Sequence, residues 1–216
     1  MAHLLHIDTS SSPTSVSRRL AAAFREVWDA EQPDATVTYR DLAADPVPHV
    51  DGDAVFTLMA EPLNDEQREA AELHHRLTEE IITADALLIS APMYNWTIPS
   101  NLKAWFDQSL VLGRTLPFGP SMNPLASRPA TLLLAFGGDY GTESPDADMN
   151  HCTPYLRTVV EKVLGYDTRF IVAEHTVMPY TSQDPAELAK AADSLQQAVR
   201  AAGDRAREVA GSFVRA

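Results

Sequence analysis

Apolar runs of strand length alternate with amphipathic segments of helix length throughout this chain, and no other feature constrains the fold as much. The strand-like runs are residues 3–8, 36–41, 86–90, 130–136 and 168–174. The helical patterns that follow them are residues 16–31, 64–83, 100–111, 153–164 and 185–214. Strands that are each followed by a helix form a parallel sheet with both faces covered. We therefore predict an α/β protein.

Five such units, joined by right-handed crossovers, favour a doubly wound sheet with the flavodoxin-like strand order 2-1-3-4-5 and helices on both faces. The chain of 216 residues is predicted to be one domain spanning residues 1–216. Ligands of such sheets bind beyond the carboxyl ends of the strands, where the order reverses between strands 1 and 3. The loops expected to form the ligand site are therefore residues 9–17, 92–99 and 137–152.

The net charge and the cysteine content exclude several kinds of partner and cofactor site. Seventeen basic and thirty acidic residues give a net charge of −13. Nucleic acid and anionic membranes are therefore not expected as partners. The single cysteine, Cys152, excludes a disulfide or a cysteine-based metal centre within one chain. The start of the sequence has no signal-peptide pattern and no long apolar run occurs, so we expect a cytoplasmic protein.

The first loop, TSSSPTSVS, is rich in hydroxyl side chains and leads into a predicted helix. Free backbone N–H groups and the positive end of a helix dipole suit a phosphate group. Ser10, Ser15 and Ser17 would add donors, and Arg18 could add charge. Neither G-x-G-x-x-G nor a Walker motif is present, which disfavours classical dinucleotide or nucleoside triphosphate binding. The alternative is that these side chains only cap the helix.

The second loop, APMYNWTIPS, holds six residues between two prolines that stiffen the backbone. Met93 and Trp96 offer flat apolar contact, and Asn95 offers both a donor and an acceptor to a planar heterocycle. The alternative is that Tyr94 and Trp96 pack under a neighbouring loop.

The third loop, FGGDYG, begins with two glycines after a predicted strand. Gly137 and Gly138 allow close backbone approach or a positive φ, so that main-chain N–H groups can converge on an electron-rich ring edge. The alternative is an ordinary turn. A phosphate at the first loop, a flat ring along the second and a polar ring edge at the third together describe bound flavin mononucleotide (FMN).

These same stretches resemble the FMN-dependent NADH-azoreductase and quinone reductase family, whose members have the flavodoxin-like fold. The resemblance covers nearly the whole chain and is most specific in PMYNWTIPSNLKAWFD. The segments SSSPTSVS, RDLAADPVP, GG, TPYL and RFIVAEH are similar in kind and spacing.

The resemblance implies three groups of cofactor-binding residues. The phosphate-binding positions are Ser10, Ser15, Val16 and Ser17; those lining the isoalloxazine ring are Met93, Tyr94, Asn95 and Trp96; those of the third segment are Ala135, Phe136, Gly137 and Gly138. The family often has a Ser-Arg pair where this chain has Ala135-Phe136. Compared with those family members, this chain lacks a hydroxyl and a guanidinium at these positions. The backbone of Gly137 and Gly138 is still available.

The family also implies an activity and an assembly. NADH or NADPH would give a hydride to flavin N5, and a quinone or aromatic azo compound would then take two electrons in the same pocket, a ping-pong scheme. The flavin carries the chemistry, so we expect no catalytic side chain and no metal. The implied homodimer places FMN at the subunit interface. Apolar residues of the long loops would cover it: Phe56, Met59, Leu116 and Phe118.

Three rival functions remain open at this stage. One is a quinone reductase that uses FAD, another is an electron carrier like flavodoxin without NAD(P)H chemistry, and the third is a reductase of one specific metabolite. For other residues we expect structural roles. His151-Cys152 should pack at a helix start, and His74-His75 should lie on the solvated face of a charged helix.

Overall fold

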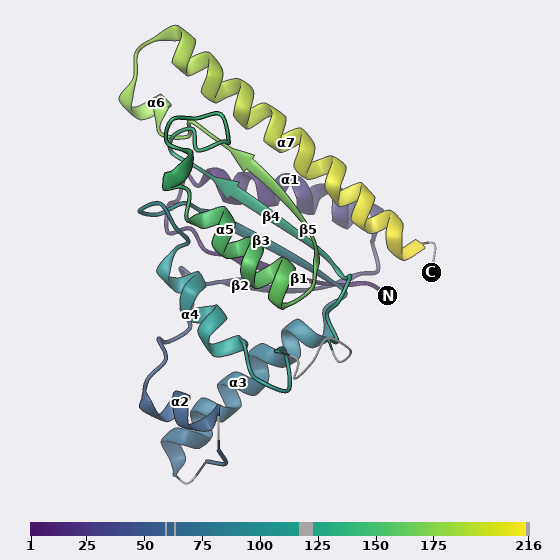
Figure 1. Cartoon of the computed structure of the whole chain (residues 1–216). Coiled ribbons are helices and arrows are strands. Elements are labelled where there is room, and N and C mark those ends of the chain that lie inside the picture. The colour runs from purple at the N-terminus through teal and green to yellow at the C-terminus, as the bar shows by residue number, and fades with distance from the viewer. Residues whose placement is uncertain (59, 63, 117–122, 215–216) are drawn as a thin grey trace.

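A computed structural model describes residues 1–58, 60–62, 64–116 and 123–214, and it contains a five-stranded, all-parallel sheet in the order β2-β1-β3-β4-β5. The strands are β1 (His3–Asp8), β2 (Thr36–Asp41), β3 (Ala86–Pro92), β4 (Pro129–Ala135) and β5 (Asp167–Ala173). The predicted fold class and strand order are confirmed (Figure 1).

Helices cover both faces of the sheet, as Figure 1 shows. One face carries α1 (Val16–Glu31) and α7 (Pro185–Val214), and the other carries α3 (Asp65–Thr83), α4 (Ser100–Ser109) and α5 (Cys152–Leu156). Each face has its own apolar core, with large aromatic side chains at its centre: Phe24 and Trp28 on the first face, Trp105 and Phe106 on the second. Fully burying one such side chain stabilises the fold by about 1.5–3 kcal/mol.

The three central strands are almost entirely buried, because helices lie above and below them. Their register brings their carboxyl ends to one edge: Asp8 pairs with Ser90, and Pro92 pairs with Ala135. The loops that follow these strands therefore begin side by side. No helix in the described ranges combines the length and the apolar content needed to cross a membrane.

Several elements differ from the prediction. The connection after β2 contains a short helix, α2 (Gly52–Thr57), whose first turn is capped by the Asp51 carboxylate at 2.9 Å from the Ala54 amide. The helix predicted over 153–164 begins at Cys152, which is buried as expected, and becomes a π-helix over Arg157–Val163. The spacing of apolar residues in the sequence does not distinguish such a short π-helical stretch from an α-helix. A short helix, α6 (Met178–Thr181), precedes α7.

His74 does not lie on a solvated face, so that prediction was wrong for this residue, although His75 is exposed. The two residues point to different sides of α3. His74 shares its side with the buried Leu77 and Ile81, three and seven positions further on. Its Nε2 lies 2.6 Å from Oε1 of Gln108 on α4, and its Nδ1 lies 3.4 Å from the Thr57 hydroxyl of α2. His74 therefore joins three helices.

Stability is expected to fall in acid because of His74. Burial lowers the pKa of His74 below its ordinary value of 6.5, and the hydrogen bond with Gln108 only partly opposes this. Below pH 6.5 His74 is protonated in the unfolded chain but stays neutral in the folded chain until the pH reaches its lower folded pKa. The free energy of unfolding is therefore highest above pH 6.5 and decreases as the pH falls toward the folded pKa. Chemical unfolding between pH 7.5 and 5 measures the loss. The loss should shrink in His74→Gln and persist in His75→Gln; equal behaviour of the two variants would contradict the assignment.

Candidate functional site

A cavity of about 370 Å³ lies at the carboxyl ends of β1, β3 and β4, in the size range of small-molecule sites. It is lined from all three predicted loops and from the segment after β5. The lining residues are Ser10, Ser12, Thr14, Ser15, Val16, Pro92, Met93, Tyr94, Ala135, Gly137, Thr176 and Tyr180. Loops that are distant in the sequence thus form one surface, as the switch-point argument requires.

The predicted site residues divide into two sets. Those on the cavity wall are Ser10, Ser15, Val16, Met93, Tyr94, Ala135 and Gly137. Those that do not line it are Ser17, Asn95, Trp96, Phe136 and Gly138. Asn95 instead lines a neighbouring hollow of about 560 Å³, to which Tyr94 also contributes. The cofactor-binding role of every residue in both sets stays a prediction.

The start of α1 forms one end of the cavity. Ser15 is its N-cap, and the Ser15 hydroxyl accepts a hydrogen bond from the Arg18 amide at 3.2 Å. The amides of Val16 and Ser17 lie in the first turn, where a helix supplies no acceptor of its own. The loop before them is bent by its own hydroxyls, since Ser10 Oγ accepts from the Ser12 amide at 3.2 Å. Serine hydroxyls and unpaired amides at a positive helix end fit a phosphate.

The second loop forms a tight hairpin. The amide of Tyr94 donates to the Thr97 carbonyl at 3.0 Å and the amide of Thr97 donates back at 3.2 Å. The two residues between them have left-handed backbones, with φ of 47° at Asn95 and 65° at Trp96. This conformation is ordinary for asparagine in a two-residue hairpin. For a bulky residue it costs about 1–2 kcal/mol, and such strain tends to occur at functional sites.

The hairpin directs Trp96 away from the cavity. The Trp96 side chain is 46% exposed, so it does not pack under a neighbouring loop. Its carbonyl accepts a hydrogen bond from the His151 amide at 2.9 Å, which ties the hairpin to the start of α5. The residues of the second loop segment that do line this cavity are Pro92, Met93 and Tyr94.

The third loop follows β4 and is tied to the second, because the Met93 amide donates to the Ala135 carbonyl at 2.9 Å. Neither Gly137 nor Gly138 has a positive φ, so that predicted reason for the glycine pair is wrong. A Cβ on Gly137 would lie 3.7 Å from the nearest atom, on Val177, which is ordinary contact. Packing in the protein therefore does not demand a glycine there. Close approach of a ligand to the backbone, the other reason considered for the glycine pair, stays a prediction beside the ordinary turn.

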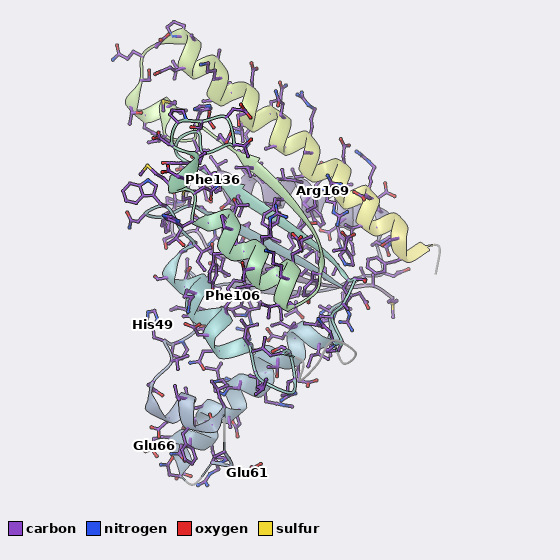
Figure 2. The ribbon with its side chains drawn as sticks, in the orientation of Figure 1. His49, Glu61, Glu66, Phe106, Phe136 and Arg169 are labelled. Carbon is purple, nitrogen blue, oxygen red and sulfur yellow. The ribbon has the colours of Figure 1, made fainter. Side chains whose placement is uncertain are left out.

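Phe136 is buried, and its main-chain groups are hydrogen-bonded within the protein. Its side chain is 1% exposed and packs edge-on against Tyr140, with ring centroids 6.1 Å apart. Figure 2 labels Phe136, which follows β4. Its amide donates to the Ala173 carbonyl at 2.8 Å, and its carbonyl accepts from both the amide and the hydroxyl of Thr176 at 3.0 Å. Alternation along the strand places Ala135 on the cavity wall and Phe136 in the core.

The segment after β5 was missed as part of the site. Thr176 and Tyr180 line the cavity, and the Tyr180 side chain is 74% exposed. The His175 amide donates to the Gly138 carbonyl at 3.2 Å, which fixes this segment against the third loop. A signal was available, because β5 follows β4 in the predicted order and its carboxyl end must lie at the same edge.

Arg18, which could add charge at the first loop, is already engaged within the protein, as are Arg114 and Arg128. Arg18 pairs with Asp8 at 3.3 Å and with Asp41 at 2.6 Å. Arg114 pairs with Glu79, and Arg128 donates to the carbonyls of residues 82 and 84 at 2.6 Å each. Within the described residues, each of the three guanidinium groups thus already donates to a carboxylate or a carbonyl.

Asp8 is a buried carboxylate at the end of β1 that interacts with several polar side chains beside the cavity. Burial raises the pKa of its carboxyl, but the hydrogen bond and charge of His6 and the hydroxyls of Ser90 and Tyr39 outweigh burial, so the pKa lies below its usual value. Burial and Asp8 in turn raise the pKa of Tyr39 to about 12. At neutral pH, then, Asp8 is ionised and the Tyr39 hydroxyl keeps its proton, which it donates to Asp8 at 2.8 Å.

The predicted covering residues are only partly described. Met59 and Phe118 lie outside the described residues, while Phe56 and Leu116 are half-buried within the chain.

A family model described as flavodoxin-like fold matches residues 2–199. An FMN-dependent NADH:quinone oxidoreductase of Streptomyces coelicolor is 45% identical over 183 residues, 83% of this chain and 82% of its own length. A protein of the same name from Streptomyces avermitilis is 38% identical over 217 residues, 99% of each chain.

Among solved structures, an FMN-dependent NADH-azoreductase of Bacillus anthracis in complex with FMN aligns with a TM-score of 0.83. The alignment covers 97% of this chain and 100% of that one at 21% identity. An azoreductase of the Sterne strain of the same species gives a TM-score of 0.82 at 22% identity, with 96% and 100% covered. These two likenesses support the fold.

Proposed function

The chain belongs to the flavodoxin-like fold family, and we propose that it is an FMN-dependent NAD(P)H oxidoreductase that passes two electrons to quinones and aromatic azo compounds. Relatives named FMN-dependent NADH:quinone oxidoreductase match it at 45% and 38% identity. The observation that carries the proposal is the single cavity framed by the start of α1, the Tyr94 hairpin and Gly137.

The residues of the cavity fit FMN from end to end. Ser10, Ser15 and the first amides of α1 would hold the phosphate, and Met93 and Tyr94 would lie against the ring. When bound, the flavin supplies hydride acceptance and two-electron donation, so no protein nucleophile or metal is needed. The Gly137 amide, on the cavity wall, would stabilise negative charge that develops on the ring. Tyr94 would also orient a flat second substrate.

We propose NADH as the preferred donor. The 2′-phosphate of NADPH needs a cation, and Arg18, Arg114 and Arg128 are all engaged with protein carboxylates or carbonyls. The relatives named above are also NADH enzymes.

We further propose that the protein is a cytoplasmic homodimer. Residues 1–216 of each subunit would form one domain. Two exposed aromatic residues line the cavity, Tyr94 at 39% and Tyr180 at 74%, and Trp96 of the same hairpin as Tyr94 is 46% exposed outside it. Exposed apolar surface beside a pocket favours cover by another molecule. Light scattering on the purified protein should give twice the mass of 23.6 kDa; the monomer mass would contradict the dimer.

Steady-state kinetics test the proposed reaction. FMN-loaded protein should oxidise NADH with menadione or an azo dye as acceptor. Varying NADH at several fixed acceptor concentrations should give parallel double-reciprocal lines, the pattern of ping-pong transfer. Chromatography of heat-released cofactor distinguishes FMN from FAD. Loaded protein that does not oxidise NADH with any acceptor would contradict the proposed reaction.

A further inference from the structure

We propose that Arg18 is a positioning residue that shapes the first loop for the cofactor's phosphate, an inference that rests on the proposed FMN site. Its guanidinium holds the carbonyl of Ser10 with two donors, Nη2 at 2.8 Å and Nε at 3.3 Å. Ser10 lies on the cavity wall, whereas Arg18 is not among the lining residues. Arg18 therefore acts on the site through the backbone of the loop.

The same guanidinium is anchored on its other side to two strands. Nη1 donates to the Asp8 carboxylate at 3.3 Å and to the Tyr39 hydroxyl at 3.2 Å, and Nη2 donates to the Asp41 carboxylate at 2.6 Å. Asp8 ends β1, and Asp41 ends β2. One planar group on α1 thus links the carboxyl ends of two strands to the loop between β1 and α1.

Two carboxylates around one guanidinium leave no net positive charge to attract a phosphate. The contribution of Arg18 is instead geometric. A carbonyl oxygen facing the phosphate would repel it, and Arg18 holds the Ser10 carbonyl on its own side. In a planar trans peptide the next N–H points opposite to that carbonyl, so the contact also fixes the direction of the Ser11 amide. Recognition of the phosphate should depend on this contact, while recognition of the ring should not.

Comparing FMN with riboflavin, which lacks the phosphate, separates these two effects. Titration of apo-protein followed by quenching of flavin fluorescence gives both dissociation constants. Arg18→Gln should raise the Kd for FMN by about tenfold or more, as expected for losing hydrogen bonds from a charged group, and change the Kd for riboflavin less than about twofold. The matched control is Arg19→Gln, which removes the same charge from the exposed neighbouring position. It should leave both constants within about twofold of the wild type.

Arg18→Lys covers the case in which Arg18→Gln does not fold. Lysine keeps the charge but lacks the planar fork that holds Ser10 with two donors, so FMN should still bind several-fold more weakly and riboflavin normally. Equal weakening of FMN and riboflavin, no change for FMN, or an equal effect in Arg19→Gln would each overturn the proposal. Wild-type protein that binds neither flavin would instead refute the FMN site itself.

Discussion

Replacing Ser15 with aspartate is expected to raise the Kd for FMN by about a hundredfold or more while the protein stays folded. Aspartate caps a helix as well as serine does and favours its positive end, so stability should be unchanged or slightly higher. The new carboxylate would occupy the position proposed for the phosphate. Two like charges 4 Å apart near a protein surface repel by about 4 kcal/mol, more than a hundredfold in affinity requires.

Titration of apo-protein with FMN and riboflavin, beside thermal unfolding, checks this result. Riboflavin should bind Ser15→Asp nearly as well as the wild type, because it brings no phosphate. Ser15→Ala is the control for the cap: it should cost about 1 kcal/mol of stability and weaken FMN binding far less. Normal FMN affinity in Ser15→Asp would place the phosphate elsewhere.

Replacing Asp8 with asparagine is expected to lower the free energy of unfolding by about 3–5 kcal/mol. The buried carboxylate accepts hydrogen bonds from Arg18, Tyr39 and Ser90 and lies 3.2 Å from Nε2 of His6. Asparagine replaces one acceptor oxygen with an NH2 group, so buried donors lose their charged partner, and each hydrogen bond to a charged group contributes about 1.5–3 kcal/mol. Urea unfolding at pH 7 measures the loss.

Asp107→Asn is the matched control for that experiment. Asp107 pairs with Lys103 one turn earlier on α4, and both side chains are at least 40% exposed. Such a surface pair contributes about 0.3–0.5 kcal/mol. If Asp8→Asn cost no more than Asp107→Asn, the network around Asp8 would not stabilise the fold.

The fold could be predicted because the spacing of apolar residues, the prolines and the order of the segments each favour one structure. Val16–Glu31 carries apolar residues on one side at helical spacing, and the helix has those bounds. Pro92 ends β3 and Pro99 precedes α4, so the approximate limits of the second loop were also predictable. Strand order follows from right-handed crossovers, and that order places the three loops at one cavity.

Side-chain direction inside the loops could not be predicted. Nothing in the residue types of NW requires two successive left-handed backbones, yet these turn Trp96 outward. Phe136 could not be assigned to the core until the end of β4 was fixed. His74 lies in a strongly charged helix, and only the position of α4 shows that its side is covered. In each case a tertiary contact decides what local pattern leaves open.

The visible absorption spectrum of the purified protein, recorded without oxygen, tests the central claim most directly. The protein is expected to show the absorbance of bound FMN, to lose it on addition of NADH and to regain it when menadione follows. Protein that remains colourless after incubation with FMN, or whose FMN absorbance is unchanged by NADH, would contradict a cofactor-binding redox site at the carboxyl ends of β1, β3 and β4.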